Sequence, residues 1–580
     1  MKLSAPNRRT IYLAIAAVVL VLLLISSSGI YWLLNRSPLA LRTGVKTAPL
    51  AASLVSRQAP AVVSLLVNPD RLQQLRQFSI KPSERSRSQR EWQRLRAQLI
   101  GPKLNYDRDV RPWLGDELTV AVTTPDIDRD TNNGKQPGYL LALTTQAADR
   151  SREFLQLFWQ QRAVGGSELV FEQYQGVPVI YEQTGTELEP GLTTAVVGER
   201  FVLFANHPKV LRAAINNLQV PELALTGLES YQQAVNNLER GRVALAFLNL
   251  PELAGWASNN GILPSLEEAS LKDWAGGIGV GLGIEAPGLL AESVLVAPGL
   301  KDTLVSATPK LSEPPPVLNY LPSNSLLALA GSDLNQLWQS VSTELAPVQG
   351  DDVLNRWVTN LEERTGLDLP QDIFAWVTSD YALGLLPSRA DNQPDFVFAA
   401  RRTDPVAVQE ALTRLDGLAL NRAKLTVGQL ELGDQNVTVW TRLVSVPVPQ
   451  KNSKRKDNSE PLSDPVVLQA PVVGVHAELG DYVLFSSSVE AMDLALRASQ
   501  FALVSTPAFR EAVAALPQPN DGYLYVNWQA DLPLLESRFP VVAALHKVVA
   551  PLLDPLQTLA LSSYGGPAGV RRAQTFIALD

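Results

Sequence analysis

The feature that most constrains this chain is a pattern of strands and helices that occurs twice along it. The segment ERFVLFANHPKVLRAAINN, which begins at Glu199, resembles GDYVLFSSSVEAMDLALRA, which begins at Gly480. Each segment predicts a strand that leads directly into an amphipathic helix, because apolar residues then recur at helical spacing. These residues are Val210, Leu211, Ala214, Ile215 and Leu218 in the first helix and Val489, Met492 and Leu496 in the second. The repetition predicts that one structural unit is used twice.

The match continues on both sides of these segments. The further pairs begin at Ser230 and Ala508, at Pro60 and Asn324, at Asp109 and Asp372, at Phe171 and Leu430, and at Gly288 and Gly569. Identities are few, but order and spacing persist. We therefore expect repeat 1 at residues 59–300 and repeat 2 at residues 323–580, joined by a stiff Pro-rich linker at 301–322.

The strands within each repeat occur in adjacent pairs, and a strict alternation of strand and helix is absent. This pattern favours an α+β class, with two tandem homologous repeats that are each a mostly antiparallel sheet with helices packed on one face. Residues 447–465, PVPQKNSKRKDNSEPLSDP, interrupt repeat 2. They are polar, basic and bounded by proline, so we expect a disordered loop.

An uncharged run of 24 residues precedes the repeats, from Ile11 through Leu24 to Leu34. A helix needs about 20 such residues to cross a bilayer. Tyr31 and Trp32 stand where an interfacial aromatic anchor belongs. We expect residues 1–10 to be a cytoplasmic tail, residues 11–34 an uncleaved transmembrane signal anchor and residues 35–58 a linker. Cleavage after Leu39-Ala40 remains an alternative.

Basic residues lie on both sides of this run, so the positive-inside rule gives nearly a tie. Short N-terminal tails with early Arg pairs usually stay in the cytoplasm, which favours a body in the periplasm or in a thylakoid lumen. The chain contains no cysteine. That composition suits an oxidising compartment and also excludes a disulfide framework and a thiolate metal site.

The charge is distributed unevenly along the chain. No acidic residue precedes Asp70, whereas seven Lys and Arg do, so the remaining 43 basic and 58 acidic residues give the body a net charge of −15. Binding to nucleic acid requires a basic face. We therefore expect no nucleic-acid partner.

Several long motifs resemble a known family. They include SLLVNPDRL, PWLGDELTVAVTT, FLQLFWQQRAV and VVGERFVLFANHPKVL, together with the N-terminal anchor. With these motifs the chain resembles a cyanobacterial family of membrane-anchored proteins, domain-of-unknown-function family 3352, over nearly its whole length. The resemblance implies a cyanobacterial origin and a plasma or thylakoid membrane. It implies no activity and no catalytic residues.

One acidic loop offers candidate metal ligands. In PDIDRDTNNGKQPG, the residues Asp126, Asp128, Asp130 and Asn132 alternate as in a calcium loop. Calcium prefers such oxygen ligands, but the EF-hand template requires a glycine at its sixth position and a glutamate at its twelfth. Thr131 and Pro137 stand there instead. A solvated hairpin tip turning at Asn133-Gly134 is the alternative.

Two other patterns are interpreted structurally. GGIGVGLGIEAPG, from Gly276, lacks the spacing of a phosphate loop, and its alternation predicts a strand with one apolar and one bare face for close packing. His207 lies at a strand-to-helix junction where Asn206 would cap and Pro208 would open the helix. His476 and His546 lie in apolar runs, so we expect no catalytic histidine.

A basic helix is expected between Lys81 and Leu99, with Trp92 and Leu95 on its apolar face. It is either a solvated helix or a surface that meets anionic headgroups or an acidic partner.

The absence of recognisable chemistry predicts a non-enzymatic interaction or assembly scaffold on a membrane, without a cofactor. Its partners would be the membrane and another membrane, lumenal or periplasmic protein. The alternative is a carrier that holds a lipid or pigment in an apolar cavity. A hydrolase built on paired carboxylates stays open, because 58 acidic residues offer many pairs.

Overall fold

The structure is a computed structural model that describes residues 44–68, 105–128, 136–183, 191–253, 276–285, 288–298, 311–345, 368–387, 394–447, 466–530, 532 and 556–579. The chain divides into two compact units. Unit 1 comprises Met1–Val305 with Leu532–Asp580, and unit 2 comprises Ser306–Asp531.

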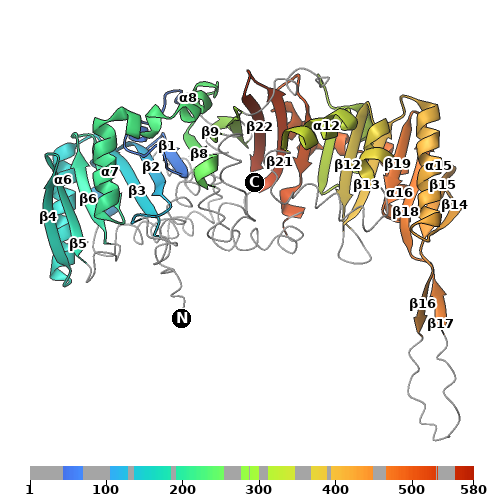
Figure 1. Ribbon diagram of the computed structural model, residues 1–580, viewed down its shortest axis with the longest axis horizontal. Coiled ribbons are helices and arrows are strands. Elements are labelled where there is room, and N and C mark those ends of the chain that lie inside the picture. Colours follow the sequence, from blue (N-terminus) through green and yellow to red (C-terminus); the bar gives the residue numbers. More distant parts are fainter. Residues whose placement is uncertain are drawn as a thin grey trace, which may run out of the picture. The chain divides into compact units, whose positions relative to one another are not determined.

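Unit 1 is built on strands that all pair antiparallel. Its strands are β1 (Ala61–Leu65), β2 (Leu114–Thr124), β3 (Gly138–Thr145), β4 (Glu168–Tyr174), β5 (Val177–Gln183), β6 (Thr193–Val197), β7 (Phe201–Ala205), β8 (Ala244–Leu248), β9 (Gly277–Glu285), β10 (Gly288–Val296), β21 (Leu556–Gly565) and β22 (Val570–Leu579). They lie in the order β4–β5–β6–β7–β3–β2–β1–β8–β9–β10–β22–β21 (Figure 1).

The helices of unit 1 lie on both faces of these strands. They are η1 (Leu50–Ser53), η2 (Tyr106–Val110), α6 (Ala148–Val164), α7 (Pro208–Gln219), η3 (Pro221–Leu223), η4 (Leu225–Gly227) and α8 (Glu229–Asn236). Trp159 of α6 donates a hydrogen bond to Thr194 of β6, whereas the next residue, Ala195, belongs to the core cluster of α7. Successive side chains of a strand point to opposite faces, so α6 and α7 cover different faces.

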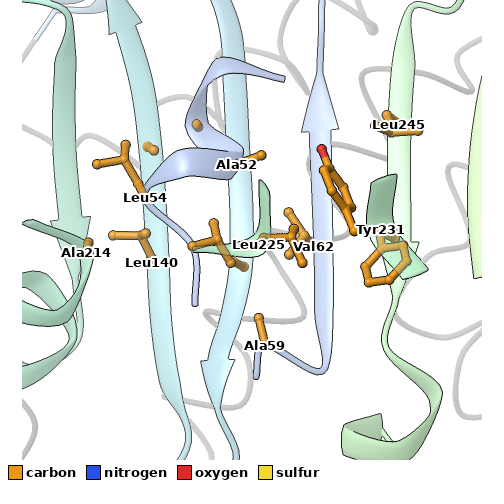
Figure 2. Packing of buried hydrophobic residues seen from close by; sticks show 14 of the residues in the cluster. Ala52, Leu54, Ala59, Val62, Leu140, Ala214, Leu225, Tyr231 and Leu245 are labelled. Carbon is orange, nitrogen blue, oxygen red and sulfur yellow. The ribbon is translucent and has the colours of Figure 1, made fainter. Parts of the chain in front are cut away.

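The main core of unit 1 lies on the α7 face. Figure 2 shows Leu54, just after η1, near Leu140 of β3 and Ala214 of α7, and the three belong to one buried cluster. Leu54 is fully buried. Part of the segment expected to be a linker at 35–58 therefore contributes core residues, and Val317 and Leu318 do the same within 301–322 in unit 2.

Unit 2 has a strand order that parallels part of unit 1. Its strands are β11 (Leu327–Ser332), β12 (Asp380–Leu386), β13 (Asp395–Arg401), β14 (Thr426–Leu432), β15 (Gln435–Thr441), β18 (Val472–Leu479), β19 (Tyr482–Ser486) and β20 (Gly522–Val526). Their antiparallel order, β14–β15–β18–β19–β13–β12–β11–β20, matches β4–β5–β6–β7–β3–β2–β1–β8 of unit 1.

The helices of unit 2 follow the same sequence of connections. They are η5 (Pro316–Tyr320), α12 (Leu334–Leu345), α14 (Leu369–Asp372), η7 (Phe374–Trp376), α15 (Pro405–Asn421), α16 (Val489–Leu496), η8 (Ala498–Gln500), η9 (Leu503–Ser505) and α17 (Pro507–Ala514). Equivalent details recur as well. The indole of Trp113 donates to the Asp109 carbonyl at 2.7 Å, and that of Trp376 donates to the Asp372 carbonyl at 3.1 Å.

Strands β16 (Val444–Pro447) and β17 (Val466–Gln469) form a separate antiparallel ribbon that extends away from the other strands of unit 2 (Figure 1). Pro447, expected to begin the disordered insertion, thus closes a strand. Residues 448–465 lie outside the described residues.

The structure corrects the expected fold class. Twenty strands are assigned to one antiparallel sheet, so the repeats do not each close a sheet of their own. Strand β22, from repeat 2, pairs with β10, from repeat 1, over nine residue pairs from Gly288 and Ala578 to Val296 and Val570. The physical reason is that β10 is largely buried and would otherwise leave a row of unpaired backbone groups at an edge. Helices on both faces also replace the single covered face that the sequence predicts.

The fold expected from the sequence also included a transmembrane helix. Within the described residues, no helix has the length and the apolar character needed to cross a membrane. The predicted anchor at residues 11–34, with Ile11, Leu24, Tyr31, Trp32 and Leu34, lies outside the described residues, as does the basic segment at 81–99.

Candidate functional site

A groove of about 570 Å³ runs between α6 and the outermost strands of unit 1. One stripe of α6 forms its first wall, because residues three and four apart share a helix face. That stripe is Arg152, Leu155, Gln156, Trp159, Gln160 and Ala163. The other walls come from Leu169 and Phe171 of β4, Pro178 and Ile180 of β5, and residues 194–196 of β6, with Ser167 before β4. The groove is therefore mainly apolar.

Aromatic contacts fix one side of α6, and its other side faces the groove that β4 and β5 line. Phe154 packs on Trp113 with 5.3 Å between ring centroids, and Phe158 meets Phe204 of β7 edge to face at 6.1 Å. Trp159 is buried, and its indole donates to Thr194 at 2.7 Å. Toward β4 the α6 stripe ends in Gln160 and Ala163, and the groove opens there.

The charged groups near the groove are already paired. Arg162 donates to Glu182 at 2.8 Å, and the same carboxylate accepts from the hydroxyl of Ser167. Arg152 bonds Asp149 at 2.8 Å and Glu199 at 3.3 Å. Since these ion pairs are exposed or half-exposed, they add little stability, but they leave neither arginine without an acidic partner.

Phe171 distinguishes the outer wall of the groove. It lies on β4, and in the described part of the chain β4 pairs with β5 alone. Its side chain is 71% exposed, which is unusual for a phenylalanine in a strand. An apolar groove bounded by a free strand edge can hold an apolar body and satisfy backbone hydrogen bonds at the same place.

The equivalent space in unit 2 is filled. Helices α6 and α15 both have 17 residues, which places Asp416 where Trp159 stands. Asp416 accepts a hydrogen bond from the indole of Trp440 at 2.7 Å and lies 3.0 Å from Nε2 of His476. Trp440 belongs to the same apolar cluster as Leu412 and Leu415 of α15. A tryptophan therefore occupies the region that is open beside α6.

This trio shifts the acidity of Asp416. Burial alone raises the pKa of its carboxyl group, but the hydrogen bonds from His476 and Trp440 outweigh burial and hold the pKa below its usual range. His476 packs against the rings of Trp440 and Phe485 at 5.5 and 5.7 Å. The environment is that of a core histidine, as the sequence predicts.

The proposed calcium loop is described only at its start. Asp126 accepts from the backbone N–H of Gln136 at 3.2 Å, and burial together with the neighbouring Asp128 raises the pKa of Asp126. Asp130 and Asn132 lie outside the described residues. Among residues the structure describes, no three His, Cys, Asp or Glu side chains gather closely enough to hold a metal ion. Calcium binding stays a prediction.

The other singled-out residues have structural surroundings. His207 is itself the N-cap of α7, where its ring accepts from the N–H of Lys209 at 3.1 Å, and Ser488 caps α16 in the same way. Asn206, expected to cap, instead bonds the backbone of Tyr139 and Pro137. His546 lies outside the described residues.

The glycine-rich segment forms β9, as the sequence predicts. Glycines occupy one face of the strand, and a Cβ at Gly279 would lie 2.9 Å from the Cβ of Ala234 in α8. The bare face therefore allows the close approach of α8.

The groove itself was not identified from the sequence. A signal for it is present, because Leu155 and Trp159 are spaced one helical turn apart and Leu169 and Phe171 alternate on the following strand. The same pattern is typical of an ordinary helix packed on a sheet. Only the way α6 packs against the strands, which leaves space beside Gln160 and Ala163, makes it a groove.

Comparisons with known proteins place the chain in a family. No curated protein matches it. Among solved structures, crystal form III of TP0453 is similar at 8% identity over 43% of this chain and 81% of that one, with a TM-score of 0.23. Crystal form I of TP0453 is similar at 9% identity over 46% and 90%, also with a TM-score of 0.23. The family described as "Protein of unknown function (DUF3352)" matches residues 15–579, and the chain belongs to that family.

Proposed function

We propose that this protein is a non-enzymatic interaction scaffold and that unit 1 binds an extended apolar segment of a partner protein beside α6. The observation that carries this proposal is the coincidence of an apolar groove with the free edge of β4. A segment added as a strand along β4 would gain main-chain hydrogen bonds and would place alternate side chains in the groove.

The exposure of Phe171 favours a protein segment over a small ligand. A small apolar molecule seated between α6 and the strands would leave the outer edge of β4 uncovered. A partner strand would cover both that edge and Phe171, which is 71% exposed. Because the body carries a net charge of −15, a partner with basic residues beside its apolar ones would also be attracted at long range.

A peptide-display selection against the purified full chain tests the proposal. We expect the recovered peptides to alternate apolar and polar residues, and Ala163→Trp, which fills the groove, to abolish their binding. Phe171→Asp is expected to weaken binding as well. Hydrogen exchange is the geometric readout, because a bound strand should protect β4 amides that do not bond to β5.

Two matched control variants distinguish binding at this groove from non-specific binding of apolar peptides. Val164→Trp changes the neighbouring residue of α6, which is 86% exposed and outside the groove. Leu430→Asp makes the same kind of change as Phe171→Asp on β14, whose neighbouring space Trp440 occupies. If the controls reduce binding as much as the groove variants do, the proposed site is wrong.

A carrier of an apolar small molecule is the second candidate, and the volume of the groove favours it. About 570 Å³ lies within the range of roughly 300–1,000 Å³ that ligand pockets occupy. Organic extraction of the purified protein would then release a hydrophobic compound in a molar ratio near one. Ala163→Trp would abolish that compound, and the protein would select no strand-forming peptides.

A further inference from the structure

A second cavity in unit 1 contains a buried arginine that forms no ion pair with any described carboxylate. The cavity has a volume of about 250 Å³ and lies between the Glu239–Arg242 loop and strands β9 and β10. Arg242 lines it and is only 1% exposed. A buried arginine normally has an acidic partner, because an uncompensated buried charge costs several kcal/mol.

The hydrogen bonds of Arg242 do not supply that partner. One terminal nitrogen donates to the Lys46 carbonyl at 2.6 Å and the other to the Leu238 carbonyl at 3.5 Å. The Nε–H has no acceptor, and no described carboxylate forms an ion pair with the guanidinium. The guanidinium therefore keeps an Nε–H donor without an acceptor at the cavity, and Glu292, which attracts it electrostatically, forms no ion pair with it.

The acidic groups around the cavity are already engaged. Glu239 pairs with Arg572, and Glu285 pairs with Arg240 at 3.4 Å. Glu292, which is 3% exposed, accepts from the backbone N–H groups of Glu239 and Arg240 and from the hydroxyl of Tyr564, at 3.1 to 3.2 Å. Lys46, on the cavity wall, is a further cation.

The fold does not require an arginine at this position. Val45 forms an isolated bridge with Arg242 in unit 1, and Leu311 forms the same bridge with Asn520 in unit 2. Asn520 is also buried, but its side-chain amide is hydrogen-bonded locally: it donates to the Pro517 carbonyl and accepts from the Gly522 N–H. A neutral residue therefore serves the same backbone position, and the charge of Arg242 calls for another explanation.

Strand β9 makes room for this arginine. A Cβ at Gly281 would stand 3.2 Å from Cδ of Arg242, and one at Gly283 would stand 3.0 Å from the Gly241 carbonyl. The bare face that admits α8 at Gly279 thus also accommodates the Arg242 side chain and keeps the cavity open beside it.

We propose that this cavity binds a small oxyanion, a carboxylate or phosphate group, between Arg242 and Lys46. Arginine recognises both groups through paired N–H donors, and lysine adds a point charge. The volume suits a single small group rather than a nucleotide or a lipid. In support, burial lowers the pKa of Arg242, and Tyr231 and Glu292 offset that effect only in part.

Calorimetric titration of the full chain with inorganic phosphate and with acetate tests this site, against sodium chloride at matched ionic strength. We expect one of the two oxyanions to bind and chloride not to. Arg242→Gln should weaken that binding by roughly tenfold to a hundredfold, because a hydrogen bond to a charged group contributes about 1.5–3 kcal/mol. Whether phosphate or acetate binds identifies the ligand group.

Lys46→Gln keeps the test decisive if Arg242→Gln does not fold, since Lys46 is exposed and outside the core. We expect it to weaken binding by a smaller factor, whereas Lys209→Gln, on α7, should leave binding unchanged. Two results would overturn the site. One is phosphate and acetate binding no better than chloride, and the other is unaltered binding in Lys46→Gln or in a folded Arg242→Gln.

Discussion

At the scale of single residues, equivalent positions of the two units carry different chemistry on the same backbone. Trp159 of α6 and Asp416 of α15 hold the same place in helices of equal length, and each bonds a residue of the underlying strands. In unit 1 the space beside the helix remains open as the groove. In unit 2 the Asp416 carboxylate bonds Trp440 and His476, and the Trp440 ring occupies the corresponding space.

The lowered pKa of Asp416 predicts a pH dependence of stability. A carboxyl group whose folded pKa lies below its unfolded value of about 3.9 stabilises the fold above that value. Its contribution is lost as the pH falls from about 3.9 through the lower, folded pKa. Between about pH 6 and pH 3, we expect Asp416→Asn to lose less free energy of unfolding than the wild type does, measured by urea denaturation.

Asp493→Asn is the control for this pH effect, because Asp493 forms an exposed ion pair with Arg497 on α16. Its pH dependence should match that of the wild type. An Asp416→Asn variant with an unchanged slope against pH would show that the trio does not stabilise the ionised carboxyl.

The paired tryptophans allow a second residue-scale prediction. Trp376→Phe removes the donor to the Asp372 carbonyl, which stays buried, so we expect the free energy of unfolding to fall by about 1–3 kcal/mol. Trp113→Phe should act similarly through Asp109. Trp338→Phe, at a half-buried ring that packs on Phe374, should cost less in the same denaturation experiment.

At the scale of elements, β9 shows which features were predictable. Alternating glycines are a local signal, and the sequence predicts both the strand and its bare face. The strand-to-helix segments that begin at Glu199 and Gly480 carry local signals too, and each forms a strand that leads into a helix, β7 into α7 and β19 into α16. Local structure that is determined by residues adjacent in the sequence can therefore be predicted from the sequence alone.

The groove and the buried Arg242 were not predictable for the opposite reason. Ala163 borders the groove only because α6 is held by Trp113 and Phe204, which lie about 40 to 50 residues away in the sequence. An arginine in an exposed-looking Glu-Arg-Gly-Arg turn reads as a surface residue, yet the glycine face of β9 buries it. Both features depend on contacts between distant segments.

The packing of β9 predicts a difference between two glycines in strands. Gly279→Ala would place a methyl group 2.9 Å from the Cβ of Ala234, so we expect a loss of about 1–3 kcal/mol of unfolding free energy. Gly428→Ala, on β14, meets nothing within 4 Å and should be neutral or slightly stabilising. Equal effects in a thermal or urea unfolding series would argue against close packing of α8 on β9.

At the scale of the whole molecule, the repeats and the compact units do not share boundaries. Unit 1 takes β21 and β22 from the end of the chain, and β22 pairs with β10. No local pattern could have predicted this pairing, because the partners lie about 280 residues apart and any strand of suitable length satisfies the same periodicity.

A truncation tests the importance of this pairing. A chain that ends at residue 555 lacks β21 and β22, so β10 is left with a free apolar edge. We expect the truncated protein to aggregate and to lose cooperative unfolding of unit 1, as seen by size-exclusion chromatography and hydrogen exchange of β10. Deletion of residues 448–465 removes a shorter segment elsewhere in the chain and should leave both properties intact.

The location of the body outside the cytoplasm also belongs to this scale and stays a prediction. Protease added to intact cells or right-side-out vesicles should cleave the body if it is exported. Full protection in intact cells, with cleavage after lysis, would place the body on the cytoplasmic side of a plasma membrane or in an internal compartment.

The pairing of β22 with β10 also has a consequence for synthesis. The ribosome completes β10 before it begins unit 2, and it makes β22 only after the whole of unit 2. Unit 1 therefore waits, with the edge of β10 uncovered, while more than 200 further residues are translated and unit 2 acquires its own fold. The unit that begins first on the ribosome is the one that finishes last.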